Sequence, residues 1–155
     1  MVAATETIIK EVNLLIQLDI DAIHLYESAI KKVSLIHVKS QLELFKADHE
    51  NHVTRLSECV QRMGGQAPEY KQDLKGRILE GFTTVRSMTG TEGALKAMRM
   101  NEVLTNRTYE SALSFDLPAD ILAIVRQNRE DERRHLKYIE TCIDQKIWES
   151  EAKAA

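Results

Sequence analysis

The sequence predicts an all-α protein, a four-helix bundle made of two helical hairpins that a long crossover joins. Apolar residues recur at helical spacing through four long segments, and no segment alternates in the manner of a strand. Only six glycines and two prolines occur in 155 residues, so the chain has few places at which a helix can stop. An internal repeat, described below, pairs the helices into two hairpins.

The first hairpin is expected to consist of two helices that meet near Ser34. The first helix, from about Thr5 to Val33, carries apolar residues at positions 8, 12, 15, 16, 20, 23 and 30, which is the spacing of one helical face. The second helix is expected to end at about position 63, because Gly64 and Gly65 follow there and glycine is common just after a helix C-terminus.

Residues 64–90 are expected to form the crossover, with a short helix over about 73–87. The third helix then runs from about Thr91, a candidate N-cap, to Ser114. A turn ending in Pro118 starts the fourth helix, which is expected to continue to about Trp148. The hairpins therefore occupy about residues 5–63 and 91–148 of a single domain, residues 1–155.

The two halves of the chain repeat each other at an offset of 83 residues. The segment YESAI at 26–30 recurs as YESAL at 109–113, and DHENH at 48–52 recurs as DERRH at 131–135. A repeat that keeps polar and ionisable residues in step points to two half-sites that face each other across a bundle. That arrangement suggests a shared metal.

Two pairs of residues on the second and fourth helices are candidate metal ligands. His49 and His52 lie three residues apart, as do Glu132 and His135, so each pair shares one face of its helix. The alternative is a solvated polar face, since other charged residues surround each pair. The repeat favours the metal.

Carboxylates that face these pairs are expected on the first and third helices, at an equal distance from each hairpin turn. Asp19 and Glu102 meet this requirement. The glutamates of the two YES segments are nearer the turns and would lie more than about 10 Å along the axis from the histidines. Asp21 competes with Asp19, but Leu104, its equivalent in the second repeat, is not acidic.

Four further residues are candidates for holding the ligands in place. Tyr26 follows Asp19 by seven residues, and Tyr109 follows Glu102 by seven, so each lies two turns along on the same inward face of its helix. Their hydroxyls could hydrogen-bond a ligand on the facing hairpin. The alternative is that both are ordinary core aromatics. Asp48 and Asp131 could orient an imidazole on a neighbouring helix.

These residues resemble the ferritin-like superfamily, whose bundles hold a di-iron or di-manganese centre with one carboxylate on each odd helix and Glu-x-x-His on each even helix. Glu102 and the segment from Glu132 to His135 follow that pattern. The segments LIQLDIDAIHLYESAI and FKADHENHVTRL look like small, uncharacterised bacterial bundle proteins of the rubrerythrin and bacterioferritin type. The resemblance covers nearly the whole chain and implies iron or manganese that reacts with oxygen or peroxide, as in an oxidoreductase.

The first repeat departs from the pattern of that superfamily. His49 stands where the bridging glutamate of the family is expected, and Asp19 replaces a longer glutamate. A carboxylate can bridge two metals, whereas a neutral imidazole binds one through one nitrogen. A mononuclear or asymmetric site, with zinc as its metal, is therefore an alternative. The alternative function is a redox-inactive structural or stress-associated dimer.

The composition of the chain argues against nucleic acid and membranes as binding partners. The formal net charge of −3 provides no basic surface for nucleic acid, and no long apolar run indicates a membrane span or a signal peptide. Cys59 and Cys142 occupy equivalent repeat positions and are expected to be buried free thiols, which fits a reducing cytoplasm. A homodimer is expected, because bundles of this size often pair through an apolar face.

Overall fold

The computed structural model describes residues 2–70 and 89–154. Its helices are α1 (Val2–Ile30), α2 (Ile36–Arg62), α4 (Gly90–Ala112), α5 (Ala119–Asp144) and the short α6 (Glu149–Ala154). None of the described residues is in a strand, so the prediction of an all-α bundle is confirmed. The short helix expected over about 73–87 lies outside the described residues. None of the described helices contains a segment apolar enough to cross a membrane.

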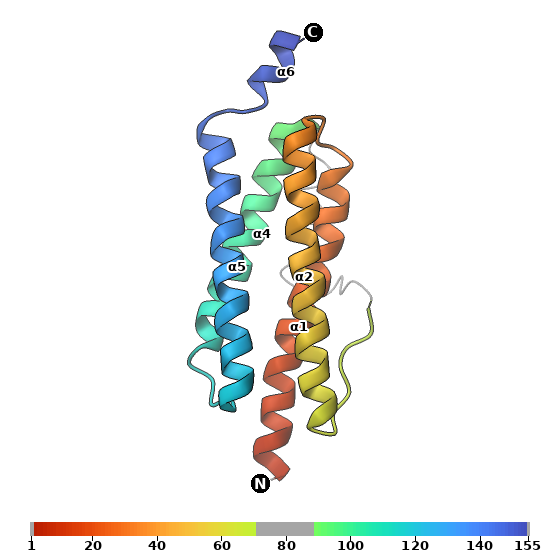
Figure 1. The fold of residues 1–155 in the computed structure, drawn as a ribbon, viewed down its shortest axis with the longest axis vertical. Helices are drawn as coiled ribbons and strands as arrows, with labels where there is room; N and C mark the ends of the chain where they lie inside the picture. Colours follow the sequence, from red (N-terminus) through yellow and green to blue (C-terminus); the bar gives the residue numbers. More distant parts are fainter. Residues whose placement is uncertain (1, 71–88, 155) are drawn as a thin grey trace.

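Two hairpins face each other to make the bundle. Helix α1 packs against α2, and α4 packs against α5, while α1–α4 and α2–α5 contacts join the hairpins. Figure 1 shows α1 and α5 running in one direction and α2 and α4 in the other, so each helix is antiparallel to both of its neighbours. The N- and C-termini lie at opposite ends of the bundle (Figure 1). Antiparallel packing places the middles of all four helices at the same level.

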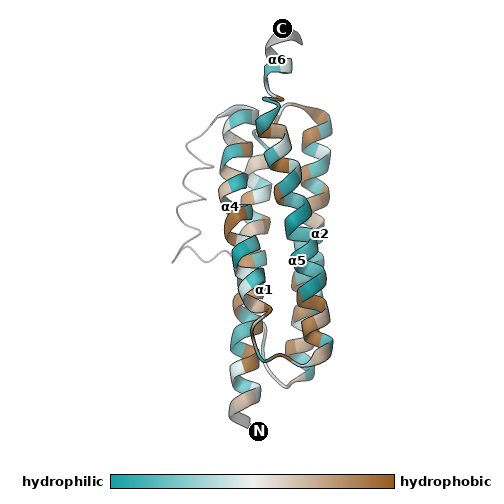
Figure 2. Ribbon diagram, turned by 90° about the vertical axis from the view of Figure 1, so that its left-hand side faces the viewer, coloured by the Kyte–Doolittle hydropathy of each residue, from teal (hydrophilic) through white to brown (hydrophobic). Residues whose placement is uncertain are grey.

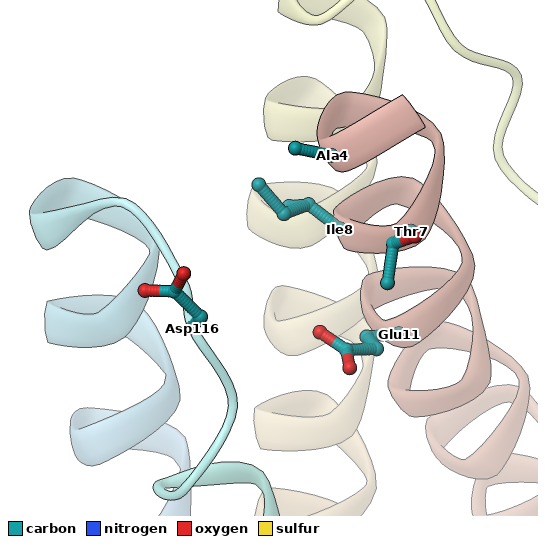
Figure 3. A pocket seen from close by; sticks show the side chains of 5 residues that line it. All are labelled: Ala4, Thr7, Ile8, Glu11 and Asp116. Carbon is teal, nitrogen blue, oxygen red and sulfur yellow. The ribbon is translucent and has the colours of Figure 1, made fainter. Parts of the chain in front are cut away.

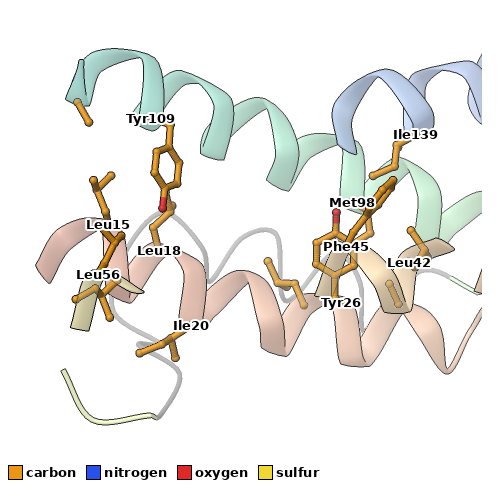
Figure 4. Close-up of a cluster of buried hydrophobic side chains, with 14 of the residues drawn as sticks. Leu15, Leu18, Ile20, Tyr26, Leu42, Phe45, Leu56, Met98, Tyr109 and Ile139 are labelled. Carbon is orange, nitrogen blue, oxygen red and sulfur yellow. The ribbon is translucent and has the colours of Figure 1, made fainter. Parts of the chain in front are cut away.

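The apolar core lies on both sides of that middle level. Figure 4 shows one group of buried side chains around Tyr109 and another around Tyr26; the first includes Leu15, Leu18 and Leu56, and the second includes Leu42, Phe45, Met98 and Ile139. The residues of α5 change along the helix in the same way, since its middle is largely hydrophilic and hydrophobic residues lie nearer its ends (Figure 2). The bundle therefore has two apolar ends and a polar waist.

The end of α2 follows the prediction from its glycines. Gly64 has a φ of 78°, and its N–H bonds the carbonyl of Gln61 at 2.9 Å. The N–H of Gly65 bonds the carbonyl of Val60 at 2.9 Å. These two bonds form a Schellman motif, which needs a left-handed residue at the position of Gly64.

Helix α5 ends before the predicted boundary near Trp148. Lys146 has a φ of 46°, and the N–H of Ile147 bonds the carbonyl of Cys142 at 3.1 Å, which closes the helix after Asp144. This is again a Schellman motif, but without the glycine that would have marked it in the sequence. The prediction of a continuous helix to Trp148 was therefore wrong.

The prediction that Thr91 caps the third helix was also wrong. Helix α4 begins at Gly90, and its N-cap is Thr89. Thr91 is buried inside the first turn, where its hydroxyl accepts a hydrogen bond from the backbone N–H of Ser34 at 3.1 Å. The side chain thus holds the start of α4 against the turn of the first hairpin instead of capping its own helix.

Replacing Gly64 with alanine should lower the free energy of unfolding by about 1 kcal/mol or more, because a Cβ atom is disfavoured at this positive φ. Urea unfolding followed by circular dichroism measures the change. Gly64→Asn is the matched variant and should lose less, since asparagine tolerates the left-handed region. Equal stability of Gly64→Ala and the wild type would contradict the expectation.

Candidate metal centre

The polar waist of the bundle holds all six residues that the sequence suggested as metal ligands. They come from each long helix: Asp19 from α1, His49 and His52 from α2, Glu102 from α4, and Glu132 and His135 from α5. No side chain among the six is more than 1% exposed. The structure brings them together, and their role as ligands stays a prediction.

Two overlapping groups of four residues could each hold a metal ion. The first group consists of Asp19, His49, His52 and Glu132, and the second of His49, Glu102, Glu132 and His135. Within each group the candidate ligand atoms lie within 4.8 Å of one another. The groups have His49 and Glu132 in common, so these two residues stand between two adjacent sites.

Hydrogen bonds join the ligand atoms of the first group. Asp19 Oδ1 lies 2.7 Å from His49 Nδ1 and 3.1 Å from His52 Nδ1. Glu132 Oε1 lies 3.4 Å from His49 Nδ1 and 3.5 Å from His52 Nδ1. The aspartate therefore pairs with both histidines of α2, while the glutamate of α5 stands close to them without a hydrogen bond.

The second group is more open. Glu102 Oε1 lies 3.6 Å from His49 Nε2 and 3.7 Å from His135 Nδ1. Glu132 Oε2 lies 3.8 Å from His135 Nδ1. These separations exceed those of a hydrogen bond. Accordingly, His49 Nε2 and His135 Nδ1 are buried and find no hydrogen-bond partner within the described part of the chain.

Both tyrosines hold a carboxylate on the opposite hairpin. The hydroxyl of Tyr26 on α1 donates to Glu102 on α4, and the hydroxyl of Tyr109 on α4 donates to Asp19 on α1. Figure 4 shows the two rings reaching across the bundle in opposite directions. Burial and the neighbouring carboxylates raise the pKa of each tyrosine well above its ordinary value, so both hydroxyls keep their protons and act as donors.

Two aspartates accept hydrogen bonds from the Nε2 atoms of two histidines across the interface between α2 and α5. His52 Nε2 donates to Asp131 at 3.0 Å, and His135 Nε2 donates to Asp48 at 2.8 Å. Arg134 connects the two aspartates, because its Nη2 lies 2.9 Å from Asp48 and 3.1 Å from Asp131. The guanidinium is about half exposed, so it closes the waist on the side of α2 and α5.

Sequence reasoning missed three residues that contact this cluster. The hydroxyl of Thr105 donates to Glu132 at 2.8 Å, and Asn128 Nδ2 donates to the Tyr109 hydroxyl at 3.2 Å. Arg134 is one of the charged residues that surround Glu132 and His135 in the sequence, and nothing there marks it as a partner of the aspartates. Thr105 and Asn128 replace apolar residues of the first repeat, Ala22 and Phe45, and that difference is the signal that could have identified them.

The three carboxylates that the sequence did not favour as metal ligands lie away from the cluster. Glu110 is exposed and pairs with Arg129 at 2.7 Å. Glu27 is half-buried at the surface, and lies 3.9 Å from the ammonium of Lys46. Asp21 is buried but accepts a hydrogen bond from Gln17, one turn away on its own helix. None of the three belongs to either group of candidate ligands.

Cys59 and Cys142 are buried free thiols, as expected.

A small surface pocket lies away from the cluster, near the start of α1 and the turn between α4 and α5 (Figure 3). It is lined by Ala4, Thr7, Ile8, Glu11 and Asp116. Glu11 precedes Asp19 by more than two helical turns, about 12 Å along the axis. The pocket is therefore separate from the cluster.

The charges of the cluster balance one another. Burial would lower the pKa of each histidine, but the facing carboxylates raise it, to about 9 for His49, about 12 for His52 and about 11 for His135. Burial would raise the pKa of Asp19 and Glu102, but the histidines outweigh it and hold both pKa values below the ordinary range. Without metal, protons on the histidines thus compensate the buried carboxylates.

Protein stripped of metal by a chelator is expected to lose stability as the pH rises above about 6.5. A histidine whose pKa is raised by folding contributes stability that is complete below its unfolded pKa and disappears as the pH passes its folded pKa. The loss should begin near the unfolded pKa, and the contribution of His49, whose raised pKa of about 9 is the lowest of the three, should be lost first. Urea unfolding midpoints across this range measure it.

The control for this experiment is His37→Gln, which removes an exposed histidine outside the cluster and should keep the same pH dependence. A midpoint that stays constant or rises with pH would contradict the expectation.

The chain matches a known protein family. Residues 7–114 match the family described as "Domain of unknown function (DUF2383)", a range that includes α1, α2 and α4 with Asp19, His49, His52 and Glu102. A search of curated proteins finds no match. Since the matched range is more than half of the chain, the protein belongs to this family of helical proteins of unknown function.

Proposed function

We propose that this protein binds two transition-metal ions between its four long helices and that the metal pair reacts with oxygen or peroxide. The observation that carries this proposal is the pair of overlapping, fully buried ligand groups that have His49 and Glu132 in common. Iron and manganese suit the mixed carboxylate and imidazole ligands, and zinc is the alternative. The resemblance to the ferritin-like superfamily supports the same reading.

The ligand atoms fit a metal better than they fit one another. Among the described residues, His49 Nε2, His135 Nδ1 and Glu132 Oε1 are buried without a hydrogen-bond partner, which is unusual for polar atoms in a folded core. Their distances to facing ligand atoms are 3.4 to 3.7 Å. Two ligands that each lie about 2.1 Å from a tetrahedral ion are separated by about 3.4 Å, so ions would fit between them.

Bound iron or manganese would supply the electron transfer that oxygen or peroxide chemistry needs. The chain supplies position and exclusion of water. The tyrosine hydroxyls hold Asp19 and Glu102, and the outer aspartates hold the rings of His52 and His135. The ring of Phe45 covers His135, with 4.3 Å between the ring centroids, and so keeps water from one side of the cluster.

A structural role without redox chemistry is the second candidate. The observation that favours it is the hydrogen bonding of Asp19 to both His49 and His52, which balances charge without a metal. In that case chelation should leave the melting temperature unchanged. If metal binds the folded protein tightly, chelation should lower it.

The double variant Glu132→Ala/His135→Ala should lose metal uptake. Glu132 belongs to both ligand groups and His135 to the second, so the first group would lose one of its four ligands and the second would lose two. Elemental analysis after anaerobic reconstitution with iron or manganese gives the equivalents bound per chain. The matched control is Glu130→Ala/Arg133→Ala, which removes an exposed pair with the same spacing on the same helix and should bind as the wild type does. Undiminished uptake by the cluster variant would defeat the assignment.

The proposed reactivity has its own test. Oxygen or peroxide should oxidise ferrous iron bound to the wild-type protein faster than the same iron free in buffer. The reason is that the buried carboxylates stabilise the higher charge of the ferric ion. Stopped-flow absorbance and the consumption of peroxide follow the reaction. The exposed-pair control should react at the wild-type rate. Stoichiometric binding of iron with no acceleration would leave the metal site standing and remove its redox role.

A further inference from the structure

The two ligand groups differ in how far their atoms are already paired. In the first group, both ring nitrogens of His52 contact carboxylates, Nδ1 with Asp19 at 3.1 Å and Nε2 with Asp131 at 3.0 Å. An ionised carboxylate only accepts hydrogen bonds, so both nitrogens of His52 carry protons. A metal can reach His52 Nδ1 only by displacing a proton and breaking its bond to Asp19.

In the second group, the inner nitrogen of His135 has no hydrogen bond that a metal would have to break. Its Nε2 donates to Asp48 at 2.8 Å, while its buried Nδ1 faces Glu102 at 3.7 Å and has no hydrogen-bond partner among the described residues. A histidine that donates one N–H to a carboxylate and points the other nitrogen into a site is the usual arrangement of a metal ligand. The second group therefore needs fewer hydrogen bonds broken than the first.

His49 stands between the groups and turns a different nitrogen to each. Its Nδ1 donates to Asp19 at 2.7 Å in the first group, and its Nε2 faces Glu102 at 3.6 Å in the second. The two nitrogens of one imidazole point away from each other, so each can serve only one of the two sites. Nε2 has no hydrogen bond to give up, whereas Nδ1 has one to Asp19.

We propose that His49 bridges the two sites through its two ring nitrogens and that the sites fill in order. The first ion binds at His49 Nε2, Glu102, Glu132 and His135, and the second at His49 Nδ1, Asp19, His52 and Glu132. The first ion displaces the protons of His49 Nε2 and His135 Nδ1, and the second displaces those of His49 Nδ1 and His52 Nδ1. All four protons pass to solvent, and His49 then binds as an imidazolate. This inference rests on the proposed function, since it requires that the cluster bind two ions.

The test is a titration of metal-free protein with Co²⁺, followed by visible absorption and calorimetry, in three single variants. Wild-type protein should bind two equivalents in two phases. His52→Ala should lose only the weaker phase, and His135→Ala should weaken the tighter phase by about tenfold or more, given that even an outer partner of a ligand is worth about that much. His49→Ala should weaken both phases, which distinguishes a bridging residue from a ligand of one site.

Two further variants, which leave the ligands themselves in place, keep the test decisive if the three ligand variants fold poorly. Asp48→Asn should weaken the tighter phase and Asp131→Asn the weaker one, since each aspartate bonds one histidine. The reverse assignment, two equal phases, or a single bound ion would overturn the inference while the metal site remained. Wild-type protein that binds no Co²⁺, iron or manganese would overturn the proposed function itself.

Discussion

The burial of charge at the waist of the bundle is the constraint on which the rest of the structure depends. Six ionisable side chains lie together in the buried middle of the bundle, and isolated charges there would be far too costly. The structure meets this cost by balancing three carboxylates with three histidines and by bonding them across the hairpins. The cross-hairpin bonds are Tyr26–Glu102, Tyr109–Asp19, His52–Asp131 and His135–Asp48. Each needs both hairpins in one register, so the polar waist also specifies how the bundle assembles.

Asymmetry is introduced within this near-symmetric frame at a few positions. His49 of the first repeat corresponds to Glu132 of the second, and Phe45 corresponds to Asn128. Phe45 lies against His135 on one side of the cluster, whereas Asn128 donates to Tyr109 on the other, so an aromatic ring covers one side and an amide the other. With these changes, the repeat gives two candidate ligand groups of related composition. The groups differ in how many of their histidine nitrogens already make hydrogen bonds.

Much of the fold and the composition of the cluster could be predicted from the sequence. Helical periodicity and sparse breakers were enough for four helices, and the equal distances from each hairpin turn placed Asp19 and Glu102 opposite the pairs on α2 and α5. The roles of Thr91 and Lys146 could not be predicted, because a hydroxyl that holds another hairpin and a left-handed lysine depend on tertiary packing. Arg134 was missed because an exposed arginine on a charged helix has no pattern of its own.

The sequence also could not reveal how the shared residues are oriented. A histidine in place of a bridging glutamate argued for one metal, since nothing in the chain order shows that the ring of His49 would turn a nitrogen to each group. That orientation depends on the hydrogen bond to Asp19, which forms only when α1 and α2 pack together. The geometry therefore makes a two-metal centre a stronger hypothesis than the sequence did.

Anomalous diffraction from crystals reconstituted with iron or manganese, measured above and below the absorption edge of the metal, tests the central claim most directly. A pair of buried metal ions predicts two adjacent anomalous peaks, one on each side of His49 and Glu132. Metal peaks only at the surface, or none in fully reconstituted crystals, would contradict the metal centre and leave the waist as a purely structural ion cluster.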